Sequence, residues 1–471
     1  MCLAIFDFSD RKSSGFYRKA LVLFFAGLFL FHPLLYAETT EQGITEQSTT
    51  DFTIETAILA AFANNRFIKM HMADVEKASA NKLYAISNFL PKVEMEYDFT
   101  AYQDTAYDAM FSQRPLPSTK KDPRTFFGYK SDNFLGLGIE QDIFKGGAHI
   151  ANFKQSELEL LSQWETYRAV TLEIEYETKR LFYGLLLAYE VERIARDLVI
   201  QAEAHYEETL AKYNQGTTSK FDVLQSKVHV ALVIPQLIIA ENSIELLMIE
   251  FKKLLALDLD EDIAINGTLA FIPIAIREKN FLVEAYVRRP EMILKTLGVS
   301  IEKWGVELAK ATGIPRLSGN FDYYGRSNNI ATMLSHRHDT WYIGVKATLP
   351  IFDGLATPAK INEARAQYLH AQLNKRDYED ELAVDIKRIC LDLKQWSAII
   401  YAQKDSIIEA REALRLSEVR YDTGVGINLD VLDCQVALAQ VEQSLAEAKY
   451  DYIMAKADLN KAMGRELSKE E

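Results

Sequence analysis

The chain has 471 residues, a formal net charge of −14 and 48% hydrophobic residues. An acidic surface repels phosphates, so a nucleic-acid partner is not expected. Only Cys390 and Cys434 lie outside the N-terminal segment. We therefore expect no disulfide framework, no metal site built from cysteines and no cofactor.

Residues 1–37 have the pattern of a secretory signal peptide. Four basic residues precede an apolar run at residues 20–30, and residues 35–37 match a cleavage site. No cysteine follows the cleavage site, so we expect no N-terminal lipid anchor. Residues 38–50 are polar and are predicted to be a flexible leader. No later segment is a long uncharged apolar span, so we also expect no transmembrane helix.

The chain then changes from a helical period to a period of two. A helix is predicted from Asp51 to about Asn88, because Ile54, Ile58 and Phe62 lie on one apolar stripe. In residues 93–99 every odd position is apolar and every even position is acidic. The same alternation recurs three more times. It predicts strands at about residues 92–103, 133–144, 316–325 and 340–352.

The length of these strands favours a membrane sheet. Strands of about 8–11 residues cross a bilayer when they are tilted; two hairpins in a soluble sandwich are the alternative. Four strands cannot close a barrel, and open sheet edges are not tolerated in lipid. We therefore expect several chains to share one barrel. The residues expected to face lipid in the first strand are Val93, Met95, Tyr97 and Phe99, with Glu94, Glu96 and Asp98 facing water.

Two very long helices follow the two hairpins. Residues 148–212 and 356–420 contain no proline except Pro358 in a first turn, where proline is tolerated. About 65 residues span roughly 100 Å, so such a helix needs packing partners along its length. Pro235 is expected to kink the helix that follows the first long one, and Pro290 to break a helix at about residues 279–310.

The helices that return from the long ones supply those partners. Their apolar residues recur at alternating spacings of three and four, which is the heptad pattern of a coiled coil. The first predicted seam is Val223, Ser226, Val230, Val233, Leu237, Ala240, Ile244, Leu247, Phe251 and Leu254. The second is Val431, Cys434, Leu438, Val441, Leu445, Ala448, Tyr452, Ala455, Leu459 and Ala462.

The turn between each pair of helices is duplicated. Tyr213, Gly216 and Asp222 recur as Tyr421, Gly424 and Asp430 at one constant offset. A repeat this long predicts a duplicated architecture. We predict a first repeat at residues 51–257, an equatorial connector at 258–278, a second repeat at 279–465 and a tail at 466–471.

In its order of elements, the chain resembles the TolC-like outer-membrane efflux proteins over nearly all of the mature sequence. The motifs that carry the resemblance are a hydrophobic residue and proline before the first strand of each half, Ile-Phe-x-Gly after each hairpin, and the duplicated turn. They lie at residues 90–91 and 314–315, at 143–146 and 351–354, and at 213–228 and 421–436.

The resemblance implies a fold and a set of partners. The fold class is a long α-helical coiled-coil barrel joined to a shared antiparallel β-barrel, with four strands per chain in a homotrimer. Such a protein lies in the outer membrane of Gram-negative cells, in contact with its lipid, and extends into the periplasm. It is a passive exit duct that works with a periplasmic adaptor and an inner-membrane transporter of the RND or ABC type, in efflux or type I secretion.

The resemblance also assigns the duplicated turns. Asp430 and Asp433 match the family's aspartates that narrow the periplasmic entrance, and Asp222 matches an acidic residue that an arginine ties down in the family. Gly426 stands where that arginine would be. The helix tips that dock the adaptor match Tyr213, Gly216, Tyr421 and Gly424. The alternatives are solvated carboxylates in a first helical turn and ordinary helix C-caps.

Two other classes of function compete with the duct. We find no phosphate loop, no nucleophile motif and no His or Cys cluster with ligand spacing, so we do not expect an enzyme. His336 and His338 lie in a loop and are expected to be solvated. The second alternative is a structural coiled-coil protein of the envelope without channel activity. The amphipathic hairpins favour the duct over that alternative, but the cargo is not encoded in any motif.

Overall fold

The computed structural model describes residues 50–101, 103, 131–327, 329–330 and 339–465. The predicted signal peptide, nearly all of the leader, the C-terminal tail and most of the two loops that join the paired strands lie outside the described residues. His336 and His338 are among the residues that are not described.

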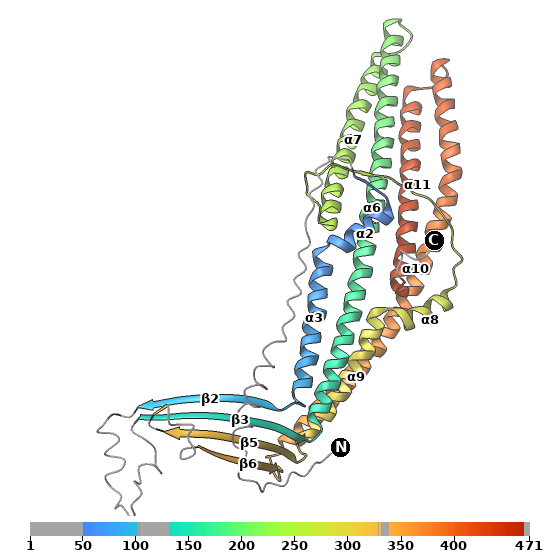
Figure 1. The fold of residues 1–471 in the computed structure, drawn as a ribbon. Coiled ribbons are helices and arrows are strands. Elements are labelled where there is room, and N and C mark those ends of the chain that lie inside the picture. The colour runs from blue at the N-terminus through green and yellow to red at the C-terminus, as the bar shows by residue number, and fades with distance from the viewer. Residues whose placement is uncertain (1–49, 102, 104–130, 328, 331–338, 466–471) are drawn as a thin grey trace, which may run out of the picture. The chain divides into compact units, whose positions relative to one another are not determined.

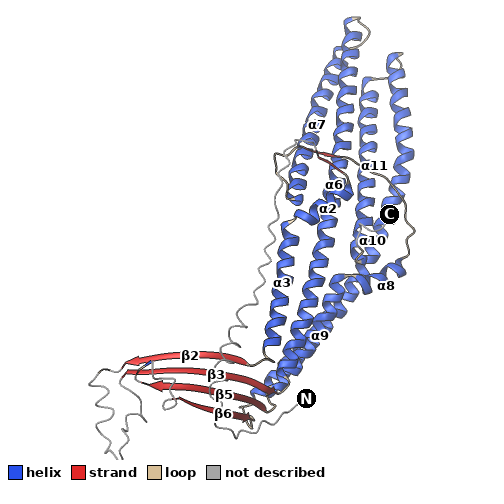
Figure 2. Ribbon diagram, viewed as in Figure 1, coloured by secondary structure: helices blue, strands red, loops and turns tan. Residues whose placement is uncertain are grey.

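Each half of the chain contains the same elements in the same order (Figures 1 and 2). The paired helices have equal lengths of 11, 22, 67 and 36 residues. The first half comprises α2 (Ile54–Asn64), α3 (Arg66–Ser87), β2 (Lys92–Ala101), β3 (Ser131–Lys145), α6 (Ala148–Asn214) and α7 (Lys220–Leu255). The second comprises α8 (Glu278–Arg288), α9 (Pro290–Ala311), β5 (Arg316–Ser327), β6 (Asp339–Thr348), α10 (Ala356–Asp422) and α11 (Asn428–Met463).

The first predicted helix is in fact two helices. The chain leaves the helical conformation at Asn65, whose side chain accepts hydrogen bonds from the backbone of Phe67 and Ile68 at 2.8 and 3.3 Å. It also donates to the Leu254 carbonyl at 2.9 Å. The expectation of one continuous helix was wrong because the stripe of apolar residues continues across this cap. The break expected at Pro290 is confirmed, since α8 ends at Arg288 and α9 begins at Pro290.

The four long strands form one antiparallel sheet in the order β2-β3-β5-β6. Residues directly opposite each other in such a sheet share a face. The pairing aligns Met95, Leu137, Tyr323 and Trp341 in one row, and Val93, Ile139, Phe321 and Ile343 in the next. The sheet therefore has one apolar face, as the alternation predicts. β2 and β6 are its open edges.

The polar face of the sheet carries charged residues at the even positions. Glu94 and Glu96 lie on it, and Arg326 donates from Nε to both carboxylate oxygens of Asp132 at 2.9 and 2.8 Å. Phe99 belongs to the apolar face but lies opposite Asn133, which lies opposite Ser327. The row that contains Phe99 is thus the polar boundary of the apolar band.

A small parallel pair was not predicted. β1 (Thr50–Phe52) pairs with β4 (Ile263–Ile265), which lies inside the segment expected to be an irregular connector. Each strand has three residues, too few for alternation to be visible. The pair places Phe52 beside Phe251, in a core that also contains the fully buried Phe182 and Leu185.

The long helices and their return helices pack as two helical hairpins, and α6 also packs against α11 (Figure 1). From one side of this helical region to the other, the four helices lie in the order α7, α6, α11, α10. No residue of either predicted seam is exposed, which confirms the heptad assignment. The most completely buried seam residues are Val431, Phe251 and Ser226.

Among the described helices, α7 is long and apolar enough to cross a membrane. It contains an 18-residue window with a mean hydropathy of 1.6, of which 11% is buried. α7 is a candidate membrane span by its length and composition alone. The absence of a transmembrane helix stays a prediction. Its exposed apolar residues include Leu224, Val228, Leu232, Ile238, Ile239 and Leu246.

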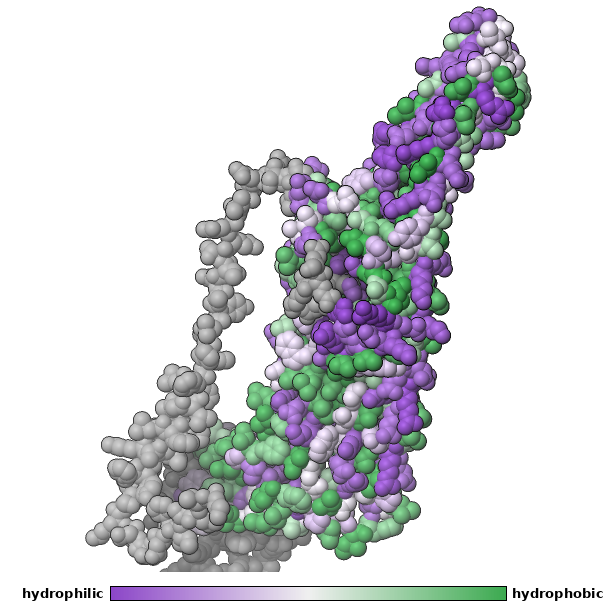
Figure 3. Space-filling model, turned by 90° about the vertical axis from the view of Figure 1, so that its right-hand side faces the viewer, coloured by the Kyte–Doolittle hydropathy of each residue, from purple (hydrophilic) through white to green (hydrophobic). Residues whose placement is uncertain are grey.

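The surface also changes character along the helices. In Figure 3, hydrophobic residues gather toward the end of the helices that meets the sheet, and the opposite end is richer in hydrophilic residues. Ile351, Phe352 and Leu355, just after β6, are 94%, 82% and 67% exposed. Apolar side chains this exposed indicate that something else covers this end of the molecule.

Candidate functional site

The two helix turns at the end remote from the sheet contain the predicted site residues. The first turn, residues 215–219, joins α6 to α7, and the second, residues 423–427, joins α10 to α11. Gly216 and Gly424 have φ of +80° and +75°, and a Cβ at either would meet nothing within 4 Å. Glycine is therefore needed here for its backbone conformation and not for space.

Gly426 differs from these two glycines. A Cβ at Gly426 would lie 3.0 Å from the Arg420 Cβ and 3.0 Å from the Tyr421 backbone nitrogen. The turn is folded tightly against the end of α10, and any side chain would require a shift of this backbone. A side chain at this position, where the resemblance places an arginine, would need the end of α10 to shift by a small amount.

The first turn is capped by its own side chains. Asp222 Oδ2 accepts hydrogen bonds from Thr218 Oγ1 and Ser219 Oγ, both at 2.8 Å, and from the Ser219 backbone at 3.2 Å. Ser219 Oγ in turn accepts from the Asp222 backbone at 3.2 Å, which completes a capping box. Burial raises the pKa of Asp222, but the hydrogen bonds from Thr218 and Ser219 outweigh it and hold that pKa below its usual range.

The two predicted tyrosines have different environments. Tyr213 is 40% exposed, whereas Tyr421 is buried and its hydroxyl donates to Thr209 Oγ1 at 3.4 Å. Lys212 Nζ lies 4.3 Å from the centre of the Tyr421 ring and donates to Asp422 Oδ1 at 2.7 Å. These contacts tie the end of α10 to the end of α6. Tyr421 therefore holds the second turn in place within the chain.

Asp430 and Asp433 lie in the first turns of α11. Asp430 is half-buried and Asp433 is exposed. Within the described part of the chain, neither carboxylate takes part in a hydrogen bond or an ion pair. Asp222, in contrast, is engaged in its cap. The two aspartates of the second turn are thus without a hydrogen-bond partner in the described chain, whereas the Asp222 carboxylate is held in its cap.

Sequence reasoning missed a cluster of polar residues between the two turns, which we call the polar joint: the buried His205, Ser226 and Asn428 and the half-buried Gln225. Asn428 is 2% exposed and lies at the start of α11. Its Oδ1 accepts from Ser226 Oγ at 3.1 Å and lies 2.7 Å from His205 Nε2. Its Nδ2 donates to Gln225 Oε1 at 3.0 Å and to the Asp222 carbonyl at 3.4 Å. The sequence contained one signal of this cluster: Asn428 is a polar residue in a turn that is rich in glycine and apolar residues.

His229 and Gln435 extend this buried polar region along α7 and α11. His229 is 9% exposed and Gln435 is 2% exposed. His229 Nε2 and Gln435 Oε1 have no hydrogen-bond partner among the described residues. Burial lowers the pKa of His229, as does His205, while Asp433 and the Gln435 side chain act in the opposite direction. His229 is therefore held neutral in the folded protein.

The burial of His229 predicts that the stability of the region around the helix turns depends on pH. The unfolded chain binds a proton at His229 near the ordinary value of 6.5, and the folded chain resists it. Stability at the turns is therefore present above about pH 6.5 and is lost as the pH falls through the lowered pKa. We expect amide hydrogen exchange around His229, corrected for its intrinsic rate, to accelerate between about pH 7.5 and about pH 5.5. The H229Q variant should lose this acceleration; an equal response in both proteins would contradict the prediction.

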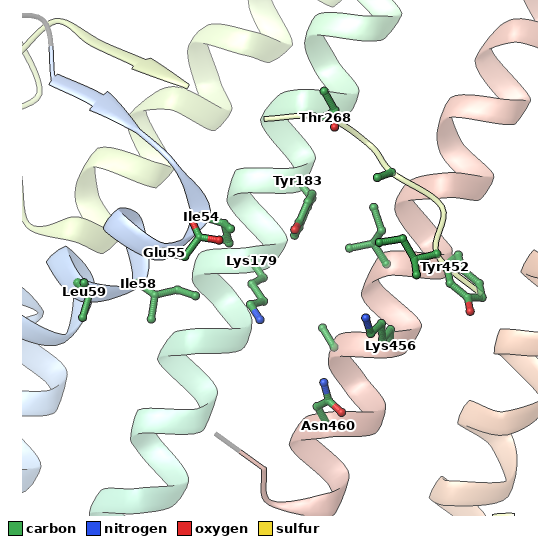
Figure 4. Close-up of a pocket in the computed structure, with 14 residues that line it drawn as sticks. Ile54, Glu55, Ile58, Leu59, Lys179, Tyr183, Thr268, Tyr452, Lys456 and Asn460 are labelled. Carbon is green, nitrogen blue, oxygen red and sulfur yellow. The ribbon is translucent and has the colours of Figure 1, made fainter. Parts of the chain in front are cut away.

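A separate cavity of about 500 Å³ lies between α2, α6, α11 and the connector (Figure 4). Lys179, Lys456 and Asn460 line it together with apolar residues such as Ile54 and Ile58. It does not include any residue of the helix turns. Among the described residues no group of three potential metal ligands is found.

Comparisons with known proteins match the family model of outer membrane efflux proteins to residues 57–255 and 282–465. The chain is 23% identical to outer membrane protein TolC of Vibrio cholerae over 391 residues, covering 77% of this chain and 86% of the relative. It is 23% identical to alkaline protease secretion protein AprF of Pseudomonas aeruginosa, covering 72% of this chain and 70% of the relative.

Solved structures show the same fold. The outer membrane protein VceC of Vibrio cholerae superposes with a TM-score of 0.76 at 19% identity, covering 88% of this chain and 96% of that one. The outer membrane channel CmeC of Campylobacter jejuni superposes with a TM-score of 0.78 at 19% identity, covering 87% and 85%.

Proposed function

Because the chain belongs to the outer membrane efflux protein family, we propose that three copies assemble into one continuous duct that crosses the outer membrane and extends into the periplasm. The protein is an outer-membrane exit duct of an efflux or secretion system and is not an enzyme. The observation that carries the assembly is the open four-stranded sheet with one apolar face.

The edges of that sheet require partner strands. β2 and β6 each have one neighbour among the described strands, so their outer backbone groups are unpaired within the described residues. Unpaired backbone groups in the hydrocarbon of a bilayer cost several kcal/mol each, at about 2–7 kcal/mol. Pairing β6 of one copy with β2 of the next satisfies both edges. Three copies give twelve strands, which is within the range of closed membrane barrels.

The helices also support assembly between copies. α7 and α10 are the outer members of the described helix order, and both expose apolar residues. Leu232 and Ile239 of α7 are 64% and 66% exposed, and Val384 and Ile408 of α10 are 67% and 70% exposed. We propose that α7 of one copy packs against α10 of the next. The equal lengths of corresponding helices support the internal two-fold repeat.

We propose that the entrance of the duct lies at the helix turns and is lined by Asp430 and Asp433. Residues three apart share a helix face, so three copies form two rings of carboxylates that attract cations and obstruct anions. Their lack of partners in the described chain supports this role. Asp222 contributes to the entrance by capping α7 next to these rings.

We propose that the tips of the turns dock a periplasmic adaptor, which links the duct to an inner-membrane transporter. Gly216 and Gly424 shape the tips, and Tyr213 is exposed beside the first of them. Val425, Ile427 and Phe221 are 73%, 61% and 70% exposed there and offer an apolar contact. Tyr421 acts by holding its turn, since it is buried.

The comparisons do not identify the class of inner-membrane transporter. One relative is named for alkaline protease secretion and others for efflux pumps, so the comparisons favour neither the RND nor the ABC type. A structural coiled-coil protein without a channel, the other class that the sequence alone left open, gives no reason for the apolar face of the sheet.

Assembly has a direct test. We expect the detergent-solubilised protein to have the mass of three chains and to conduct ions when it is inserted into a planar bilayer. Native mass spectrometry and conductance measurements on the same preparation check both points. A folded monomer rich in β-structure would contradict the shared barrel, and a trimer that passes no current would favour the structural protein.

A further inference from the structure

Asn428 uses every hydrogen-bonding position of its side chain. A primary amide has two acceptor sites and two donor hydrogens. At Asn428 the oxygen serves Ser226 and His205, and the nitrogen serves Gln225 and the Asp222 carbonyl. All four partners belong to α6 and α7, while Asn428 begins α11. One buried side chain therefore connects the second helical hairpin to the first.

The corresponding position of the first repeat is different. Lys220 stands there and is exposed. α7 begins with the capping box of Ser219 and Asp222, whereas α11 has Ile427 at its N-cap, with no side-chain hydrogen bond to the helix. A helix start without a side-chain cap is less stable than one with a cap. The start of α11 thus lacks local support and depends on contacts with the first hairpin.

We infer that Asn428 is the positioning residue that holds the second helical hairpin against the first at the entrance, and that breaking the polar joint is a step in opening the duct. This inference rests on the proposed function. Asp430 and Asp433 follow Asn428 by two and five residues on the same helix, so the position of Asn428 determines where their carboxylates stand. Gly426 has no side chain to hold this turn.

The ion pair between the hairpins is a weaker candidate for this role. Lys212 and Asp422 form an ion pair in which Asp422 is 55% exposed, and exposed pairs contribute little. Most of the polar joint is buried, so removing Asn428 leaves the buried Ser226 and His205 without a partner. Leaving buried polar groups unpaired carries the full cost of their desolvation.

The test compares three variants of the full-length protein in planar bilayers and in hydrogen exchange. N428A removes the side chain, N428L keeps its volume without its hydrogen bonds, and K220A is the matched control in the first repeat. We expect N428A and N428L to raise the mean conductance several-fold. We also expect them to accelerate exchange at the start of α11 roughly ten-fold or more, while the heat stability of the oligomer is unchanged. K220A should behave as the wild type.

The outcomes separate this inference from the proposed function. If N428L keeps the wild-type conductance and exchange, the hydrogen bonds of Asn428 do not hold the entrance and the inference is wrong, although the duct stands. If the wild type itself passes no current, the duct fails and the opening role fails with it; exchange on the same samples still reports whether Asn428 holds the hairpins together.

Discussion

The M95R variant is expected to lose about 2–4 kcal/mol of folding free energy in the membrane. Met95 is 76% exposed and lies in the row of Leu137, Tyr323 and Trp341, within the apolar band of the sheet. A charge there faces hydrocarbon. The neighbouring residue Glu96 lies on the opposite face, so E96R is the matched control and is expected to change stability little.

The measurement is the denaturant dependence of the oligomer reconstituted in lipid vesicles. M95R should shift the unfolding midpoint far more than E96R. Phe99 provides a second apolar-face position for comparison, because its row includes Asn133 and Ser327 and lies at the boundary of the apolar band. F99R should therefore cost less than M95R. Equal effects of M95R and E96R would show that the assignment of the two faces is wrong.

Replacing Asp430 and Asp433 together with alanine is expected to reduce the preference for cations several-fold and to weaken block by multivalent cations. Six carboxylates would disappear from the entrance of a three-chain duct. Buried Val431 and Leu438 remain to pack the helices, so we expect closure to depend on this apolar packing and to respond only weakly to salt.

Reversal potentials in a salt gradient and titration with a trivalent cation check this result. The matched control is D405A/E409A, a pair of exposed acidic residues one turn apart on α10. The control should keep wild-type selectivity and block. Unchanged selectivity in D430A/D433A would return these aspartates to the role of solvated residues in a first helical turn.

Much of the fold could be predicted because its signals are periodic. Strict alternation at residues 93–99 located a strand and its apolar face, and the spacing around Val431 and Leu459 located the coiled-coil seam. The break at Asn65 could not be predicted, because the apolar stripe continues across it. The pair β1–β4 was missed because three residues carry no visible period.

The candidate site could be predicted only in part. The two turns could be located from Gly216 and Gly424, because a glycine in the motif indicates the positive φ that the backbone has there. The role of Asp222 as a cap and the burial of Tyr421 depend on which hairpin packs against which, and local spacing does not encode that. Asn428 was missed for the same reason, since its partners lie about 200 residues away in the chain.

The exposed apolar surface of α7 has a consequence for biogenesis. In the proposed assembly, a newly exported copy carries this helix, with its window of mean hydropathy 1.6, uncovered until another copy packs against it. Exposed surface of this kind favours aggregation, and the stability of an obligate oligomer depends on the concentration of its protomers. We therefore expect single copies to be short-lived clients of periplasmic chaperones. The abundance of finished ducts should then rise more steeply than in proportion to the rate of synthesis.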